Sequence, residues 1–490
     1  MSIVIALDLG TTGNRAMAFD QNGTCLASEY RDLTQHFPQP GWVEHDPLEI
    51  WAAVQDVLNQ VIQAVSDKEI VGIGITNQRE TSLLWHRDSG QPIANAIVWQ
   101  CRRTQTRCDE LAVHASLIKA KTGLKLDPYF SASKIEWLLQ NTPNAQTMAE
   151  NGDLCAGTID TWIIWQLTQG TVHATDVSNA SRTMLYNIHT HEFDAGLMNI
   201  FNIPAAILPK VQASASHFGD TSPKITGKAI PITGVIGDQQ AALFAQCGNQ
   251  RGEIKNTYGT GLFIAANTGQ EIPHTEALIN TIAWQINDQV TYAMEGSVFI
   301  GGAAIQWLRD GLGLIESASE TEALARSVPD SDGVIFVPAL SGLGCPYWDP
   351  DARGMIIGIT RGSTRAHLVR ACLDALCYQT RDVLEEIRRT CPEQIFTNLK
   401  VDGGATQNPF LMQEQANILG MTVRVAEFAD STAWGAAGMA GIGAGAWSLD
   451  QFQACQQGYH DYLPDPSSEP NRDTGYHLWK KAVERCLDWA

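Results

Sequence analysis

The chain has 490 residues, of which 44% are hydrophobic and 18% charged, and its formal net charge is −20. This length is too great for one hydrophobic core and indicates several domains, and the composition is that of an ordered globular protein. The negative charge argues against nucleic acid as the main partner, because a surface that binds its phosphates needs clustered Lys and Arg. A small anion can still be bound by backbone amides.

The cysteines and the N-terminus predict a reduced, cytoplasmic protein. None of the eleven cysteines forms a Cys-x-x-Cys pair, and no Cys/His spacing matches a zinc site. The first residues enter a strand directly, without a basic and then apolar leader. No uncharged apolar run approaches the roughly twenty residues of a membrane span.

The N-terminal stretch "IVIALDLGTTGNRAMAFDQNG" (residues 3–23) predicts two strands joined by a Gly/Thr turn. Such a turn points several N–H groups one way and adds the hydroxyls of Thr11 and Thr12, so it can wrap phosphate oxygens. Asp8 ends the first strand, where its carboxylate could hold a Mg²⁺-bound water. Arg15 begins the return strand and could add a charged contact. On this motif alone, an ordinary hairpin is the commoner explanation.

A helix and a buried strand follow. In "HDPLEIWAAVQDVLNQVIQAV", Asp46 can serve as N-cap, Pro47 as the first helical residue and Glu49 as the returning acid of a capping box. Apolar residues then recur at helical spacing and predict one buried stripe. The run "IVGIGIT" (residues 70–76) is typical of a buried strand.

Two adjacent charges, Arg79 and Glu80, come directly after that strand. Ligands of open α/β sheets bind at the carboxyl ends of strands, so a donor and an acceptor there could grip neighbouring hydroxyls of a polyol. The alternative is a solvated surface ion pair, which contributes little. Trp99 and Tyr129, judged singly, are expected in the core.

Asp238, in "GVIGDQQAALFAQ", follows a glycine at the start of a predicted helix. The N-terminal dipole favours its ionised form, which could accept a proton from an attacking hydroxyl. Phosphoryl transfer asks for an oriented base more than for a raised pKa. The alternative is that Asp238 merely caps its helix.

The second half repeats the strand and glycine-turn pattern. "NTYGTGLFI" (residues 256–264) has a Gly-Thr-Gly turn between strands, and an Asp-Gly-Gly turn (residues 402–404) precedes a helix capped by Asn408. Three such turns are what a nucleotide between two lobes would need. A Gly- and Ala-rich helix after residue 430 would let a neighbouring backbone approach closely, and "CGNQRG" (residues 247–252) marks the expected boundary between the lobes.

Many segments together resemble the glycerol kinases of the FGGY carbohydrate kinase family. They run in family order from residue 3 to about 445. The segments are "DLGTTGNRA", "PGWVEHDPLEIW", "GITNQRET", "NAIVWQCRRT", "DPYFSASKIEWLL", "GTIDTWIIWQLTQG", "NASRTMLYNIHT", "GDQQAALF", "NTYGTG", "GAAIQWLRD", "GLGCPYWDPDARG" and "VDGGATQNPFLMQ".

The resemblance implies an α/β fold of two ribonuclease H-like (actin-like ATPase) lobes flanking a nucleotide cleft. The lobes would span residues 1–247, with the phosphate turn and the glycerol side, and residues 248–490, on the nucleotide side. The implied activity is phosphorylation of glycerol by ATP to sn-glycerol 3-phosphate with Mg²⁺, the first step of glycerol utilisation. Partners other than glycerol and ATP would be further copies of the chain, since dimers and tetramers occur in the family.

The resemblance also assigns residues to roles. Asp238 matches the catalytic base, and Asp8 lies near the metal. The glycerol-binding positions are Arg79, Glu80, Trp99, Tyr129, Asp238, Gln239 and Phe263, of which Trp99 and Phe263 match the apolar walls of the pocket. The nucleotide positions are Thr11, Thr12, Gly13, Arg15, Thr260, Gly302, Gln306, Gly404 and Asn408.

Four positions depart from the family pattern. Leu9 stands where the bacterial pattern commonly has Gln, and Gly13 and Asn14 stand where the pattern Thr-Thr-Ser-Ser-Arg has two Ser. Gly13 keeps a backbone amide but lacks a hydroxyl for phosphate. Members regulated by fructose 1,6-bisphosphate carry Arg where this chain has Ala229, which argues against that regulatory site.

Two other functions remain open. Another FGGY kinase, acting on a pentulose, erythritol or gluconate, would use the same turns and Asp238, so only Arg79, Glu80, Trp99 and Phe263 discriminate. An actin-like or chaperone-like nucleotide-gated protein would need the turns without a polyol pocket. It would hydrolyse ATP without an acceptor.

Overall fold

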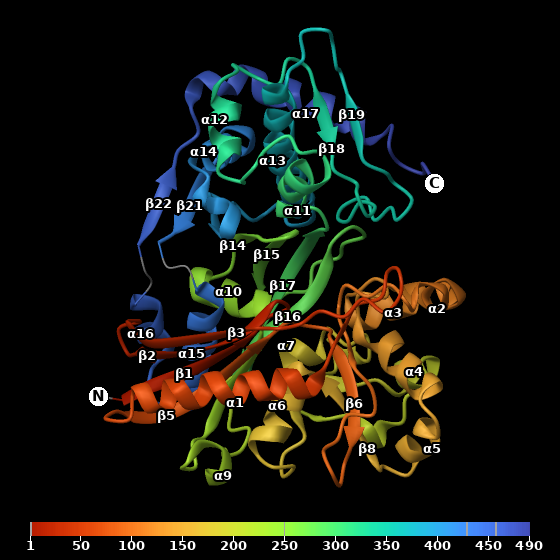
Figure 1. Cartoon of the computed structure of the whole chain (residues 1–490), viewed down its shortest axis with the longest axis vertical. Helices are drawn as coiled ribbons and strands as arrows, with labels where there is room; N and C mark the ends of the chain where they lie inside the picture. The colour runs from red at the N-terminus through yellow and green to blue at the C-terminus, as the bar shows by residue number, and fades with distance from the viewer. Residues whose placement is uncertain (1, 249, 428–429, 456–457) are drawn as a thin grey trace. The chain divides into compact units, whose positions relative to one another are not determined.

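The structure is a computed structural model that describes residues 2–248, 250–427, 430–455 and 458–490. The chain forms two compact α/β units (Figure 1). The first unit comprises Met1–Gly248, Asn280–Tyr292 and Asp430–Gln456, and the second comprises Asn249–Ile279, Ala293–Ala429 and Gln457–Ala490. The α/β fold class is therefore confirmed.

The division of the chain differs from the single boundary expected between residues 1–247 and 248–490. Two later segments return to the first unit, and one carries the helix α15 (Ser431–Gly443). A Cβ on Gly435 would lie 2.0 Å from the carbonyl oxygen of Ala241, and one on Gly443 would lie 1.8 Å from that of Thr233. The glycines let this helix pack backbone against backbone in the first unit, which confirms the predicted close approach but moves the helix across the expected boundary.

The main sheet of the first unit has the strand order β13-β5-β1-β2-β3. β1 pairs antiparallel with β2 and parallel with β5, and β13 is parallel to β5. α1 packs against β2 and β3 and α6 against β5, and their apolar residues share one core with alternate residues of β1. α15 packs against β1, β5 and β13. The bounds are β1 (Ser2–Leu9), β2 (Gly13–Asp20), β3 (Cys25–Asp32), β5 (Glu69–Asn77), β13 (Ile232–Gly237), α1 (Pro47–Ala64) and α6 (Ile159–Leu167).

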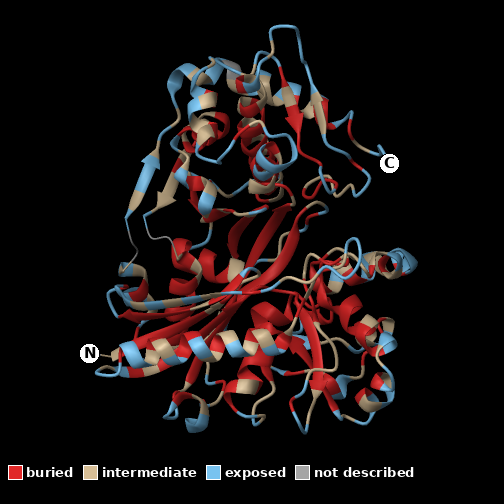
Figure 2. Ribbon diagram, viewed as in Figure 1, coloured by how far each residue is buried: buried red, intermediate tan, exposed pale blue. Residues whose placement is uncertain are grey.

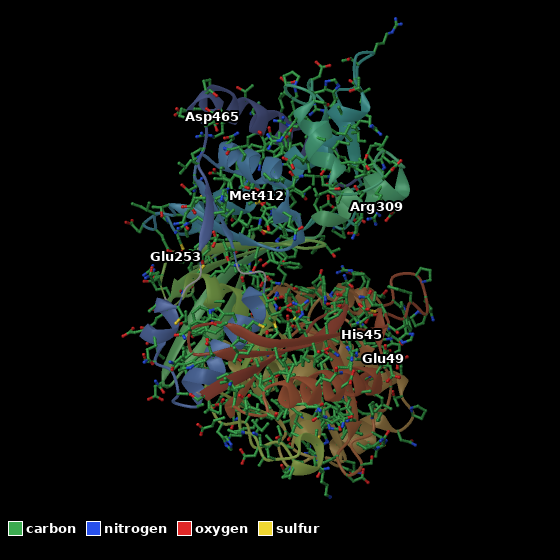
Figure 3. The ribbon with its side chains drawn as sticks, turned by 60° about the vertical axis from the view of Figure 1, so that its left-hand side comes forward. His45, Glu49, Glu253, Arg309, Met412 and Asp465 are labelled. Carbon is green, nitrogen blue, oxygen red and sulfur yellow. The ribbon has the colours of Figure 1, made fainter. Side chains whose placement is uncertain are left out.

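The helix α1 begins as predicted, with Asp46 as N-cap accepting a hydrogen bond from the N–H of Leu48. The capping box is wrong, because the Glu49 carboxylate accepts from the N–H of Thr34 instead. This bond ties the loop after β3 to the helix. Figure 3 labels Glu49 and its neighbour His45, whose pKa burial lowers to about 4.

The remainder of the first unit surrounds a small sheet of order β4-β7-β6-β8. Its strands are β4 (Glu44–His45), β6 (Ser82–His86), β7 (Ala96–Ile97) and β8 (Leu154–Thr158). Short strand pairs are formed by β9 (Ala174–Asp176) with β12 (Lys210–Gln212) and by β10 (Tyr186–Asn187) with β11 (Glu192–Phe193). The helices are α2 (Gln105–Glu110), α3 (Ala115–Thr122), α4 (Ser131–Asn141), α5 (Ala145–Glu150), α7 (Val177–Ala180), α8 (Ala195–Ile200), α9 (Pro223–Thr226), α10 (Asp238–Cys247) and α16 (Leu449–Ala454).

The second unit is built on a sheet of order β16-β17-β15-β14-β20-β21-β22, in which most of β16 and the start of β17 are counted with the first unit. The strands are β14 (Ile254–Tyr258), β15 (Leu262–Gly269), β16 (Ile279–Ile286), β17 (Gln289–Val298), β20 (Asn398–Asp402), β21 (Thr422–Ala426) and β22 (Tyr459–Tyr462), with a separate pair, β18 (Ile335–Val337) and β19 (Met355–Ile357). The helices are α11 (Gly302–Gln306), α12 (Glu320–Arg326), α13 (Arg365–Thr390), α14 (Pro409–Leu419) and α17 (Glu469–Val483).

The central strands of both units are largely buried, while the edge strands β3 and β22 and the outer faces of the helices are partly exposed (Figure 2). The antiparallel β14–β15 hairpin and the cap of α14 by Asn408 follow the sequence prediction. Among the described residues, no helix has the length and apolar character needed to cross a bilayer.

Candidate active site

The predicted Gly/Thr turn joins β1 to β2. The carbonyl oxygen of Gly10 accepts from Nε2 of Gln78 at 3.0 Å. That of Thr12 accepts from the N–H of Leu33 at 2.9 Å. These bonds tie the turn to the end of β5 and to the segment after β3. The turn is held in place from two sides, which suits a loop that has to present N–H groups to an anion.

The side chain of Tyr30 fills the space that a side chain at position 13 would need. A Cβ at this position would lie 2.2 Å from the hydroxyl oxygen of Tyr30 and 2.5 Å from the carbonyl oxygen of Arg31. The Tyr30 hydroxyl donates to the carbonyl of Thr12 at 3.3 Å. Tyr30 therefore occupies the place that a larger residue in the turn would need, which explains the glycine.

Asp8 lies beside the turn and pairs with Arg15 across the β1–β2 ladder. The pKa of Asp8 is raised to about 7, chiefly by burial and to a smaller extent by the Asp238 carboxylate, while Arg15 opposes the shift. The Arg15 guanidinium itself forms an ion pair with Asp430, at the start of α15. The Asp8 and Asp238 carboxylates are thus near enough to influence each other, and such hard oxygen donors with excess negative charge would suit a Mg²⁺ ion with its waters.

Arg79 and Glu80 are not a surface ion pair, because 2% or less of either residue is exposed. Nη1 of Arg79 donates to Oε1 of Gln240 at 3.2 Å, and Nη2 donates to the hydroxyl of Tyr129 at 3.4 Å. Glu80 adopts a left-handed backbone conformation (φ 63°), which is uncommon for a residue with a Cβ. Such strain is typical of a site that must aim a side chain.

Asp238 is the first residue of α10, and its N-cap is Gly237. Its Oδ1 lies 3.1 Å from Nε of Arg79 and accepts from the N–H of Gln239 at 2.7 Å, and 31% of its side chain is exposed. The position just before it is fixed, since the N–H of Gly237 donates to Oγ of Ser178 at 2.9 Å. Asp238 is thus a partly exposed carboxylate held by an arginine. A residue that only caps its helix would not need this arginine.

Two aromatic rings stand beside these charges. The rings of Trp99 and Tyr129 pack edge to face with centroids 5.7 Å apart. Nε1 of Trp99 donates to Oγ1 of Thr11 at 3.0 Å. Trp99 is therefore bonded directly to the Gly/Thr turn, and the first unit brings Asp8, Thr11, Arg79, Glu80, Trp99, Tyr129 and Asp238 together.

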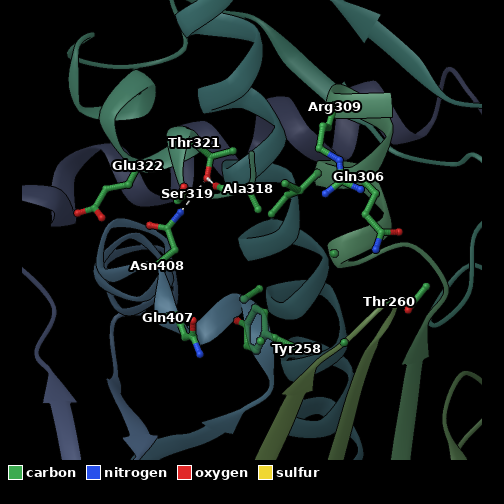
Figure 4. A pocket seen from close by; sticks show the side chains of 15 residues that line it. Tyr258, Thr260, Gln306, Arg309, Ala318, Ser319, Thr321, Glu322, Gln407 and Asn408 are labelled. Atoms are coloured by element: carbon green, nitrogen blue, oxygen red, sulfur yellow. Dashed lines mark hydrogen bonds between the residues drawn. The ribbon is translucent and has the colours of Figure 1, made fainter. Parts of the chain in front are cut away.

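The second unit contains a pocket of about 420 Å³ that gathers its predicted nucleotide residues (Figure 4). The predicted residues in its lining are Thr260, Gly302, Gln306, Gly404 and Asn408. Residues that the sequence did not single out complete it: Tyr258, Gly259, Ile305, Arg309, Ala318, Ser319, Thr321, Glu322, Ala405 and Gln407. Segments far apart in the sequence thus form one cavity within a single unit.

The walls of this pocket are anchored by short contacts. The N–H of Gly302 donates to the carbonyl of Gly259 at 2.9 Å, which joins α11 to the turn after β14. Nδ2 of Asn408 donates to Oγ1 of Thr321 at 3.1 Å (Figure 4), while its Oδ1 caps α14. Gly403 has a φ of 96°, and a Cβ there would lie 2.4 Å from the carbonyl oxygen of Tyr258. The Asp-Gly-Gly turn therefore needs glycine at this position.

Comparison with known families decides the classification. The model of the FGGY family of carbohydrate kinases, N-terminal domain, matches residues 3–245, and that of the C-terminal domain matches residues 254–444. The chain belongs to the FGGY family of carbohydrate kinases. Together the two matches cover most of the chain, in the order that the sequence resemblance predicted.

Curated relatives of this FGGY kinase match it over its whole length. Glycerol kinase 2 of Thermotoga maritima is 50% identical over 495 residues, which cover 100% of this chain and 99% of the relative. Glycerol kinase of Aquifex aeolicus is 50% identical and covers 100% of both chains. Among solved structures, Plasmodium falciparum glycerol kinase with ADP has a TM-score of 0.92 at 36% identity, covering 99% of this chain and 98% of that one.

A more distant family member shares only the fold. Xylulose kinase from Lactobacillus acidophilus has a TM-score of 0.89 at 22% identity and covers 99% of this chain and 98% of its own. The architecture alone therefore does not choose the acceptor among FGGY kinases.

Sequence reasoning missed three residues that shape the first unit's site. Arg182 and Lys134 are fully buried cations, and Gln240 receives the hydrogen bond from Arg79. The segments around the first two matched the family pattern, but nothing in their spacing marks a buried charge. Lys134 has its pKa lowered to about 8 by burial, and its Nζ donates to the carbonyls of Tyr129 and Phe130.

Two predicted glycerol-side residues have less support from geometry. Phe263 is half-buried on β15 and belongs to the second unit, so its role as a pocket wall stays a prediction. Gln239 contacts Asp238 through its backbone N–H, and the role of its side chain stays a prediction as well.

Proposed function

We propose that this FGGY kinase transfers the γ-phosphoryl group of ATP to glycerol and releases sn-glycerol 3-phosphate and ADP, the first step of glycerol utilisation. The observation that carries the choice of acceptor is full-length identity of about 50% to curated glycerol kinases. The buried Arg79–Glu80 pair beside Asp238 is consistent with glycerol as the acceptor, because a small polyol needs paired hydrogen-bond donors and acceptors in a confined space.

On the acceptor side, Arg79 and Glu80 fix two hydroxyls and Asp238 accepts the proton of the third as its oxygen attacks the γ-phosphorus. Arg79, 3.1 Å from Asp238, favours the ionised carboxylate that a base must offer. Trp99 and Tyr129 narrow the space to a short polyol. The position of the base contributes more than a high pKa, since the transition state of phosphoryl transfer is loose.

On the nucleotide side, the second unit's pocket takes ATP with Thr260, Gly302, Gln306, Gly404 and Asn408 as the binding residues. The phosphate groups are met by Thr11, Thr12 and Gly13 of the turn, with Arg15 near them. Bound Mg²⁺ neutralises charge on the phosphates, and Asp8 would hold it through water. The reaction is thus divided: the first unit holds the acceptor, the base and the turn that meets the phosphate groups, and the pocket of the second unit holds the rest of the nucleotide.

A coupled assay of ADP release tests the function. Glycerol, xylulose, erythritol and gluconate are each supplied with ATP and Mg²⁺, alongside a reaction without acceptor. We expect glycerol to give by far the highest kcat/KM. Preference for another polyol would assign the chain to a different FGGY activity, and ATP hydrolysis independent of any acceptor would overturn the kinase function.

We further propose that the enzyme acts in the cytoplasm and self-associates as a dimer or tetramer. Light scattering behind a sizing column gives the assembled mass. A single species at the mass of one chain would contradict self-association.

A further inference from the structure

Arg182 is a charged residue that the mechanism above does not use. It follows α7 in the first unit, its side chain is 0% exposed, and its Nε donates to Oε1 of Glu80 at 2.6 Å. Its guanidinium carbon lies 5.5 Å from the ring centroid of Tyr129 and 5.2 Å from that of Phe130. A buried guanidinium thus touches both the carboxylate and the aromatic platform of the acceptor site.

The distances show how two arginines share two carboxylates. Nε of Arg79 lies 3.8 Å from Oε1 of Glu80 but 3.1 Å from Oδ1 of Asp238. The Glu80 oxygen is instead bonded to Arg182. Because Arg182 satisfies Glu80, Arg79 remains available to Asp238. Without Arg182, the buried Glu80 carboxylate would compete with Asp238 for Arg79, since a buried charge demands a partner.

The surroundings of Glu80 also limit where its side chain can go. Its carbonyl oxygen accepts from Oγ of Ser82 at 2.8 Å and from Oγ of Ser131 at 3.2 Å, which holds the left-handed turn. The backbone therefore fixes the direction in which the Glu80 side chain leaves the chain, and Arg182 fixes the position of its carboxylate. Carboxylate–guanidinium bonds are directional enough to supply that second constraint.

We propose that Arg182 is a positioning residue of the acceptor site: it aims the Glu80 carboxylate at a substrate hydroxyl and, by occupying that carboxylate, leaves Arg79 to Asp238. The inference deepens the proposed function and rests on it. Buried ion pairs contribute little net stability, because desolvation offsets the attraction. A role in positioning the Glu80 carboxylate gives a reason for the Arg182–Glu80 ion pair in the acceptor site.

The test compares Arg182→Gln and Arg182→Lys with a matched control, Arg103→Gln. Arg103 is likewise a buried guanidinium, bonded to Glu44 at 2.7 Å and lying over the rings of Trp42 and Trp137. Each full-length variant is assayed for the KM of glycerol, the KM of ATP, kcat and thermal midpoint, and glycerol binding is measured by calorimetry without nucleotide.

For Arg182→Gln we expect the KM and Kd of glycerol to rise between about tenfold and 10²-fold, as for a misplaced positioning group, while the KM of ATP is unchanged. Arg182→Lys keeps the charge and should recover part of this loss. Arg103→Gln should lower the thermal midpoint without changing the KM of glycerol. An unchanged glycerol KM in Arg182→Gln, or an equal rise in both KM values, would overturn the proposal.

If Arg182→Gln alone does not fold, the double variant Glu80→Gln with Arg182→Gln provides the test instead. It removes both buried charges and should regain thermal stability. Its glycerol KM should equal that of Glu80→Gln alone, because the two residues act through one carboxylate. Effects that multiply would show independent roles and overturn the proposal. A wild-type enzyme inactive on glycerol would instead overturn the proposed function.

Discussion

The two units use the same strand arrangement for different purposes. In the first, the β1–β2 hairpin adjoins β5, which is parallel to β1; in the second, the β14–β15 hairpin adjoins β20, which is parallel to β14. The turn of the first hairpin lies beside Asp8 and Arg15 and is bonded to Gln78 and Trp99. The turn of the second opens onto a pocket lined mainly by neutral residues. Under the proposed function, the first unit would hold the acceptor and the base, and the second unit's pocket would hold most of the nucleotide.

The strongest test of this division is Asp238→Asn. The amide keeps the shape and the contact with Arg79 but cannot take up the proton, so kcat should fall by roughly 10²-fold or more. The KM of ATP should not change, because the nucleotide pocket lies in the second unit. Steady-state kinetics with each substrate varied give both values, and near-normal turnover would remove Asp238 as the base.

Gly302→Ala makes the converse change in the second unit. A Cβ at this position would lie 2.8 Å from the carbonyl oxygen of Gly259, so α11 and the turn after β14 must separate. We expect the KM of ATP to rise roughly tenfold, a loss of about 1.4 kcal/mol. The KM of glycerol should be unchanged. If both KM values rise together, the assignment of nucleotide and acceptor to separate units is wrong.

Much of the fold was predictable because its signals are local. Strand–turn–strand patterns, the caps of α1 and α14 and the Gly/Ala-rich helix all depend on neighbouring residues. The unit to which α15 belongs was not predictable. Its glycines indicate that some backbone lies against the helix, but only the folded chain shows that this backbone belongs to Ala241 and Thr233.

In the candidate site, too, some residues could be predicted from the local sequence and others could not. Arg79, Glu80 and Asp238 stand at strand and helix ends, where the sequence points to ligand chemistry. Arg182 could not be predicted because its partner, Glu80, is distant in the sequence. Lys134 could not be predicted because its ammonium is held by nearby backbone carbonyls, which no sequence pattern marks. The sequence shows only that Gly13 lacks a hydroxyl. The reason for the glycine, the Tyr30 side chain in the adjacent space, is visible only in the structure.

Acid should weaken the first unit through His173. Its ring packs edge-on against Trp85 and Trp165, and burial lowers the pKa from 6.5 to about 4. The unfolded chain binds the proton more readily, so this contribution to stability is complete above pH 6.5 and is lost as the pH falls towards 4.

Urea unfolding between about pH 7 and about pH 5 measures this loss. His173→Gln keeps a side-chain donor for the Ala156 carbonyl, which the ring meets at 2.9 Å, but cannot titrate, so its stability should depend less on pH. The exposed His217 offers a control, and His217→Gln should follow the wild type. Equal slopes for the wild type and His173→Gln would contradict the assignment.

Tyr30→Phe should have the smallest effect. The change removes the hydroxyl that donates to the Thr12 carbonyl, while the ring still fills the space beside Gly13. Because that bond is exposed, we expect a loss of roughly 0.5 kcal/mol, seen as about a twofold rise in the KM of ATP. The KM of glycerol should stay constant, since the β1–β2 turn serves phosphate. A larger effect on glycerol than on ATP would place the turn on the acceptor side and contradict its assignment to the phosphate groups.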